Sequence, residues 1–129
     1  MTIKEVSEKY HISADTLRYY ERVGMIPPVP RTASGIRNYG PHECGWIELA
    51  ICMRRAGLPI EAMIEYVKLF QVGDSTIPAR LQLLQCQRDK LLEQQAKTAQ
   101  TLARLKHKIS IYKEALVNGH LDWDCEPKA

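Results

Sequence analysis

Residues 15–39, with the sequence DTLRYYERVGMIPPVPRTASGIRNY, decide the fold of this chain. The first ten residues are typical of a short helix that carries arginine and paired tyrosines and ends at Gly24. The prolines that follow forbid helix, and Ser34-Gly35 is a turn signal before a return strand over Ile36–Tyr39. The stretch therefore predicts a helix beside a small basic hairpin. Such a pair can place the helix in the major groove of DNA and the hairpin on the flanking phosphates.

A second short helix is predicted in front of this one. Thr2 and Glu5 have the T-x-x-E spacing of a capping box, in which each side chain bonds a free backbone amide of the other residue. Ser13 is a suitable N-cap for the helix that continues to about Val23. Two short helices joined by a tight turn predict a helix-turn-helix.

A pair of helices is expected after the hairpin. Gly40-Pro41 opens the third helix, which stops at Gly57. Pro59 starts a fourth helix that runs to about Gln71. The fold class is therefore mainly α, with a winged helix-turn-helix and helix pair over residues 1–72.

The predicted fifth helix is the longest element of the chain, since no proline or glycine occurs between Pro78 and Val117. We place the element at residues 76–117 and a short tail at 118–129. Positions spaced alternately by three and four residues are mostly apolar, which is typical of a coiled-coil seam. A helix of roughly 60 Å cannot bury this seam against so small a domain, so a second copy, antiparallel or parallel, is the simplest partner. The expected dimerisation residues are Leu81, Leu84, Leu91, Leu102, Leu105, Ile109 and Tyr112.

Composition and charge limit the classes of function that this chain can have. The chain has 129 residues, 26% charged and 45% hydrophobic, as in an ordinary soluble protein. No apolar run is long enough for a membrane span and no signal peptide is visible, so we expect a cytoplasmic protein without a membrane partner. The net charge of +3 is weak, but the basic residues of the region 18–55 are all arginine, the best residue for bidentate phosphate and guanine contacts. They are Arg18, Arg22, Arg31, Arg37, Arg54 and Arg55.

Asp15–Gly24, D-T-L-R-Y-Y-E-R-V-G, and Ser34–Tyr39, S-G-I-R-N-Y, resemble the DNA-binding half of the MerR transcription regulators. The order of elements resembles this family from end to end, and the almost absent effector region excludes the large drug-binding domain of some relatives. The resemblance implies a homodimer joined by an antiparallel coiled-coil helix. It also implies double-stranded promoter DNA with a near-palindromic operator and RNA polymerase as partners. An activating signal then makes the dimer bend and untwist the promoter spacer.

The DNA contacts are expected on the second helix and the wing, the name we give to the hairpin of residues 27–39. Arg18 can reach a base edge or a phosphate, and tyrosine hydroxyls can donate to phosphates, although one of the paired tyrosines can instead pack inward. The resemblance assigns phosphate contacts to the wing residues. Arg54 and Arg55 stay open between phosphate contacts and a solvated helix end. The expected set is Thr16, Arg18, Tyr19, Tyr20, Arg31, Arg37 and Tyr39.

Cys52 is the candidate sensor. The segment Trp46–Glu61 resembles the NmlR/AdhR subgroup, which has a single cysteine at this place and responds to aldehydes and other thiol-reactive electrophiles. A thiolate can add to an aldehyde carbonyl; Arg55 favours the thiolate, and the nearby helix C-terminus disfavours it. The alternative is a small buried packing residue. Cys44 and Cys86 are expected to pack.

Other functions were weighed against this one. Soft-metal relatives use a cysteine near Cys86 and a cysteine pair in the tail, where this chain has Cys125 alone, five residues after His120. We therefore expect no metal and no cofactor, and keep a soft-metal regulator or a non-sensing winged-helix DNA binder as alternatives. An enzyme is not expected, because the chain has no Ser-His-Asp order, phosphate loop or H-E-x-x-H motif. Without a CxxC pair, the four cysteines are expected as thiols.

Overall fold

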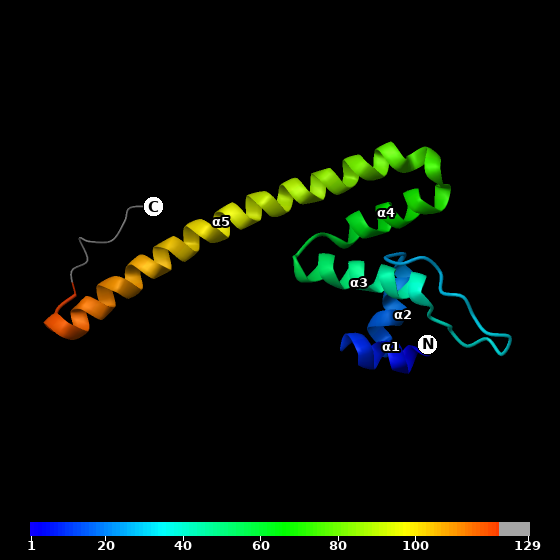
Figure 1. The fold of residues 1–129 in the computed structure, drawn as a ribbon, viewed down its shortest axis with the longest axis horizontal. Helices are drawn as coiled ribbons and strands as arrows, with labels where there is room; N and C mark the ends of the chain where they lie inside the picture. The colour runs from blue at the N-terminus through cyan, green and yellow to red at the C-terminus, as the bar shows by residue number, and fades with distance from the viewer. Residues whose placement is uncertain (122–129) are drawn as a thin grey trace. The chain divides into compact units, whose positions relative to one another are not determined.

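The computed structural model describes residues 1–121, which form helices joined by short connections and by one long loop over residues 24–40, between the second and third helices (Figure 1). The expectation of a mainly α fold is confirmed. The elements in chain order are α1 (Ile3–Tyr10), α2 (Ala14–Val23), α3 (Pro41–Arg55), α4 (Ile60–Val72), the short 3₁₀ helix η1 (Asp74–Thr76) and α5 (Ile77–Asn118).

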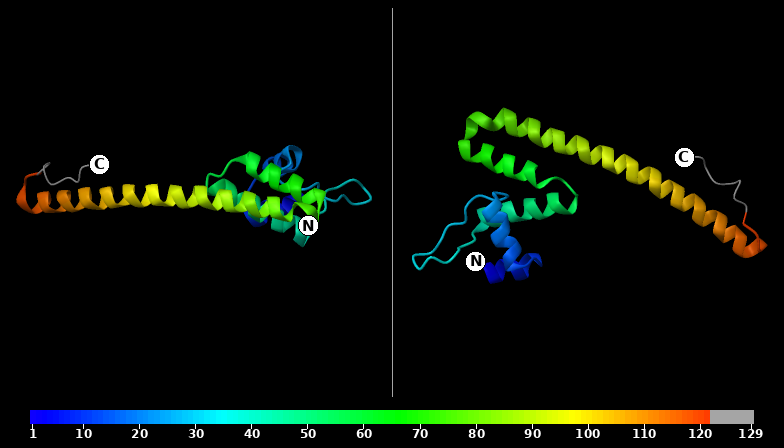
Figure 2. Two further views of the ribbon diagram at one scale, coloured as in Figure 1. Left: turned by 90° about the horizontal axis from the view of Figure 1, so that it is seen from above. Right: turned by 180° about the vertical axis from the view of Figure 1, so that it is seen from behind.

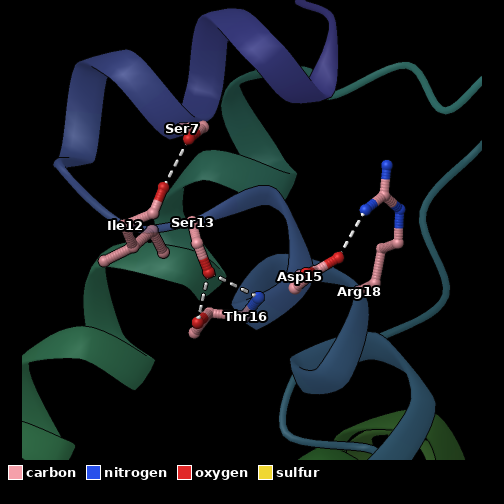
Figure 3. A network of polar contacts seen from close by, with 6 residues as sticks. All are labelled: Ser7, Ile12, Ser13, Asp15, Thr16 and Arg18. Carbon is pink, nitrogen blue, oxygen red and sulfur yellow. Dashed lines mark hydrogen bonds and ion pairs between the residues drawn. The ribbon is translucent and has the colours of Figure 1, made fainter.

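Local capping explains where the first two helices begin and end. The Thr2–Glu5 capping box is formed, since the Thr2 hydroxyl accepts from the Glu5 amide and the Glu5 carboxylate accepts from the Thr2 amide. Ser13 caps α2 through the Thr16 amide at 3.0 Å (Figure 3). Gly24 ends α2 with a φ of +87°, a left-handed conformation that glycine adopts without strain.

The turn between α1 and α2 is held by side chain and backbone together. His11 ends α1 in the left-handed region, with a φ of +56°. The Ser7 hydroxyl donates to the Ile12 carbonyl oxygen across the turn (Figure 3). The sequence-predicted helix-turn-helix is therefore present.

Helices α3 and α4 run side by side in opposite directions (Figures 1 and 2). The core beneath them collects side chains from every helix of the first half of the chain. Its largest fully buried side chains are Val6, Leu17, Met25, Ile26, Tyr39, Ile47 and Met63.

The wing is less regular than the sequence predicted, and it extends away from the helices (Figure 2). We expected a return strand over Ile36–Tyr39, but a single bridge between Arg31 and Arg37 is the extent of β pairing in this segment. Pro27, Pro28 and Pro30 have no N–H groups, so the incoming arm cannot support a longer ladder. The loop is closed instead by bonds such as that from the Thr32 amide to the Ile36 carbonyl, at 2.7 Å.

Helix α5 begins and ends within one residue of the predicted limits. The chain divides into two compact units within this helix. The first unit covers residues 1–88, and the second begins at Asp89. Arg80 ties the start of α5 to the turn after α4, since it donates to the Gly73 carbonyl at 3.1 Å and to the Thr76 hydroxyl at 3.0 Å.

The side chains of the predicted seam of α5 are partly exposed to solvent in the single chain. Leu91 is half-buried, and the other expected dimerisation residues are 40–55% exposed. Within residues 1–121, no helix combines the length and the apolar character that crossing a membrane requires. The tail beyond residue 121, which includes Cys125, lies outside the described residues.

Candidate nucleic-acid interface and thiol pocket

The exposed side of α2 holds the predicted groove-facing residues. Thr16 is in the first turn, where its hydroxyl lies 2.8 Å from that of Ser13. Arg18 forms an ion pair with Asp15 at 2.8 Å (Figure 3), and the Asp15 side chain is 94% exposed. Exposed ion pairs contribute little to stability, so a phosphate or a base edge can compete with Asp15 for the Arg18 guanidinium.

The paired tyrosines have different surroundings. Tyr20 is buried, whereas Tyr19 is half-buried and lies against the Arg22 guanidinium, 5.4 Å from the ring centre. Tyr20 is therefore the tyrosine that packs, and Tyr19 is the one whose surface is partly open.

The wing arginines are held by the protein itself. Arg31 donates to the Gly35 carbonyl at 2.9 Å, which closes the tip of the wing. The Arg37 Nε donates to Glu21 Oε1 at 2.7 Å, and both side chains are largely covered. A phosphate contact by Arg37 would therefore use its terminal nitrogens.

Glu21 is a residue that the sequence analysis missed. Its second oxygen, Oε2, accepts from the Val29 amide at 2.9 Å, so one carboxylate of α2 holds both arms of the wing. Burial alone would raise the pKa of Glu21, but the bonds from Arg37 and Val29 and the positive charges of Arg37 and Arg31 lower it overall. The sequence did contain a signal for this role, because Glu21 is an acidic residue in a region, 18–55, that carries six arginines with which it could pair.

Tyr39 lies at the base of the wing and is 1% exposed. Its hydroxyl has no hydrogen-bond partner among residues 1–121, and burial raises its pKa. Its backbone pairs with the chain start, because the Met1 ammonium donates to the Tyr39 carbonyl at 2.6 Å. A phosphate contact by this hydroxyl therefore requires the wing to move.

Arg54 and Arg55 stand at the end of α3. Arg54 donates to the Leu58 carbonyl at 3.2 Å, which ties the end of α3 to the following turn. Arg55 lines a pocket of about 400 Å³ together with Cys52.

This pocket, which we call the thiol pocket, lies between the end of α1 and one side of α3. The Cys52 side chain is exposed into it, so the alternative of a small buried packing residue does not fit. The hydroxyl of Tyr10 donates to Glu48 Oε1 at 2.7 Å within its wall. The lining residues are Lys9, Tyr10, His11, Glu48, Ile51, Cys52 and Arg55.

The other described cysteines differ from each other. Cys44 is buried, as expected, whereas Cys86 is exposed in the single chain rather than packed. Over residues 1–121 no three side chains of the metal-binding types come together. Cys125 falls outside this range.

A helix-turn-helix, a basic wing and a long helix with an apolar seam define a winged-helix DNA-binding protein. The model of the MerR helix-turn-helix family of regulatory proteins matches residues 1–69. The chain belongs to the MerR family, and it is a DNA-binding transcription regulator rather than an enzyme.

Individual relatives agree with this assignment. The HTH-type transcriptional regulator AdhR of Bacillus subtilis is 53% identical over 93 residues, which are 72% of this chain and 66% of the relative. An HTH-type transcriptional regulator of Haemophilus influenzae is 30% identical over 118 residues, 92% of this chain and 87% of the relative. The expected resemblance to the NmlR/AdhR subgroup is thereby confirmed.

Two solved structures have the same fold. A MerR family transcriptional regulator from Listeria monocytogenes is 46% identical with a TM-score of 0.88, over 92% of this chain and 90% of that one. HiNmlR, described as a MerR family regulator that lacks the sensor domain and is bound to promoter DNA, is 30% identical with a TM-score of 0.82, over 92% and 94%.

Proposed function

We propose that this regulator is a homodimer that distorts promoter DNA in response to reactive aldehydes or related electrophiles, which it senses at Cys52. The observation that carries the proposal is the exposure of the Cys52 thiol in a pocket of the DNA-binding half. A modification there is within reach of both α1 and α3, so it can alter how the helix-turn-helix is held.

DNA binding by this chain is expected to use the surface of α2 and the wing. Thr16, Arg18 and Tyr19 supply the groove-facing side, and Arg31 and Arg37 supply charge at the wing. HiNmlR, one of the relatives of known structure, is bound to promoter DNA, which supports a promoter as the target here. Tyr20 and Tyr39 are buried, so we assign them mainly to packing in the free protein. Tyr39 would contact DNA if the wing moves on binding.

The dimer is proposed from the seam of α5. Several large apolar side chains of one helix stay about half exposed, and burying the exposed half of each would contribute about 1 kcal/mol. An antiparallel pairing would present two DNA-binding units to a near-palindromic operator. RNA polymerase at the same promoter is the further partner that activation by DNA distortion requires.

Two alternatives remain distinct from this proposal. A soft-metal regulator would use Cys86 and Cys125, and a non-sensing DNA binder would use no cysteine. Each predicts a different response to substitution of Cys52.

In vitro transcription from the chain's own promoter tests the proposal. With the wild type, a small aldehyde such as propionaldehyde should raise transcription several-fold. Cys52→Ala should abolish the rise while leaving DNA affinity unchanged. Cys86→Ala, which removes another exposed thiol, is the matched control and should respond like the wild type.

An aldehyde response that survives in Cys52→Ala would contradict Cys52 as the sensor. A response to a soft metal that disappears in Cys86→Ala would support the metal alternative.

A further inference from the structure

The thiol pocket contains a hydrogen bond between two helices that are far apart in the sequence. Tyr10 is the last residue of α1, and Glu48 lies 38 positions later on α3. The 2.7 Å bond between them links the first helix of the helix-turn-helix to the helix that carries Cys52. A change at Tyr10 is therefore a change in how α1 is attached to α3.

Cys52 lies one helical turn beyond Glu48 on α3. Residues four apart occupy the same face of a helix, separated by about 6 Å along its axis. Both side chains line the same cavity of about 400 Å³, as does the Tyr10 ring. An oxygen atom added next to the Cys52 sulfur would thus enter the cavity that Tyr10 and Glu48 line.

The Tyr10 hydroxyl is suited to donate to such an oxygen. Burial, followed by the hydrogen bonds to Glu48 and Cys44, raises its pKa. It therefore stays protonated at neutral pH and keeps its single donor. A phenol donates one hydrogen bond at a time, so a new acceptor on Cys52 competes directly with Glu48.

We propose that Tyr10 detects the carbonyl-derived oxygen of an aldehyde adduct on Cys52 and, in doing so, releases α1 from α3. The inference rests on the proposed function, because it takes Cys52 as the reacting thiol. It deepens that function by naming the class of compound, which is an aldehyde whose adduct keeps a hydroxyl group.

The chemistry balances without a further reactant. The Cys52 sulfur forms a bond to the carbonyl carbon, and the π electron pair of the C=O bond moves to oxygen. That oxygen takes up the proton lost by the thiol, which gives a hemithioacetal hydroxyl. The Tyr10 hydroxyl then donates to this oxygen instead of Glu48 Oε1.

The main test uses Tyr10→Phe in the full chain, with propionaldehyde as the probe and Tyr66→Phe as the matched control. Tyr66 lies on α4 beside Trp46, outside the thiol pocket. Its variant loses one phenol hydroxyl, as Tyr10→Phe does, but leaves the pocket unchanged. Occupancy is measured as protection of the Cys52-containing peptide from iodoacetamide, and transcription is measured in parallel.

We expect Tyr10→Phe to raise transcription without aldehyde towards the induced level, because α1 is already released. Aldehyde should then add little, although Cys52 is still protected. Half-protection should need a similar aldehyde concentration, within a few-fold, because in the wild type the Tyr10 hydroxyl exchanges its bond to Glu48 for a bond to the adduct and the number of hydrogen bonds stays the same. Tyr66→Phe should match the wild type. Normal basal transcription with full induction in Tyr10→Phe would overturn the inference and leave Cys52 as a sensor, whereas an unprotected wild-type Cys52 would overturn both.

A second measurement does not depend on how Tyr10→Phe folds. Methyl methanethiosulfonate converts the Cys52 thiolate to a methyl disulfide and releases methanesulfinate, so the adduct fills the pocket without an oxygen acceptor. In a chain that carries Cys86→Ala and Cys125→Ala, complete modification of Cys52 should leave transcription at the basal level. Full activation by this oxygen-free adduct would overturn the role of Tyr10.

Discussion

At the scale of single residues, Glu21 explains how a loop with little β pairing keeps its place. Its carboxylate accepts from the Arg37 guanidinium and from the Val29 amide, one on each side of the wing tip. The side chains of Glu21 and Arg37 are 16% and 23% exposed. Charge-assisted bonds in such surroundings are stronger than exposed ion pairs, so Glu21 stabilises the wing in the absence of DNA.

Glu21→Gln should lower the free energy of unfolding by about 1–2 kcal/mol at pH 7. The pKa of Glu21 in the folded chain lies below the ordinary 4.5, so the carboxylate stabilises the fold above that pH. This part of the stability is lost as the pH falls from about 4.5 through the lowered pKa. Urea unfolding between pH 3 and 7 should show a weaker acid dependence in the variant.

Asp15→Asn serves as the control for that experiment, since the Asp15–Arg18 pair is exposed and should contribute no measurable stability. Equal stabilities of Glu21→Gln and the wild type across this pH range would contradict the assigned role of Glu21.

At the scale of elements, α5 combines two kinds of segment. Its first turns are anchored by Arg80 to the turn after α4, and its later turns expose the apolar seam. A helix with an exposed seam of this kind is stabilised by pairing with a second helix. Ile109 is a seam position and is 52% exposed in the single chain.

Ile109→Glu should therefore convert a dimer into monomers at low micromolar concentration, because it would bury an unpaired charge in the seam. Light scattering after gel filtration measures the mass directly. Gln100→Glu adds the same charge at a position outside the seam and should leave the dimer intact. An Ile109→Glu protein that remains dimeric would show that this part of α5 is not in the interface.

At the scale of the whole molecule, the proposed dimer would bind DNA through two copies of the same surface. Each copy brings α2 and one wing, and Arg31 lies at the wing tip. Every phosphate neutralised by a protein cation contributes about 0.9 to the magnitude of the slope of log K against log salt. When a dimer loses one phosphate contact per copy, the magnitude of this slope therefore falls by about 2.

Arg31→Gln should reduce the magnitude of that slope by about 2 in the dimer, and by about 1 in the monomeric Ile109→Glu background. Fluorescence anisotropy titrations at several salt concentrations measure it. Arg104→Gln, which removes an equal charge from α5, should leave the slope unchanged. An unchanged slope in Arg31→Gln would remove Arg31 from the phosphate contacts.

The helices of this protein were predictable because their signals are local. The Thr2–Glu5 box, the Ser13 cap, Gly24, and the long interval without glycine or proline in α5 set limits that the structure matches closely. The order of these elements, together with the residues of α2 and the wing, was also enough to indicate a MerR regulator.

The details of the candidate sites depended on contacts between distant residues, which local patterns do not contain. Tyr39 is buried at the base of the wing and its backbone is bonded to the chain start, Glu21 holds the wing from α2, and Cys52 shares its pocket with Tyr10 from another helix. Local patterns were enough to predict the helices and the family, because caps, breakers and periodicity act within a few residues. Which tyrosines are buried and which thiol faces a pocket could be known from the folded chain alone, because burial depends on side chains brought together from separate elements.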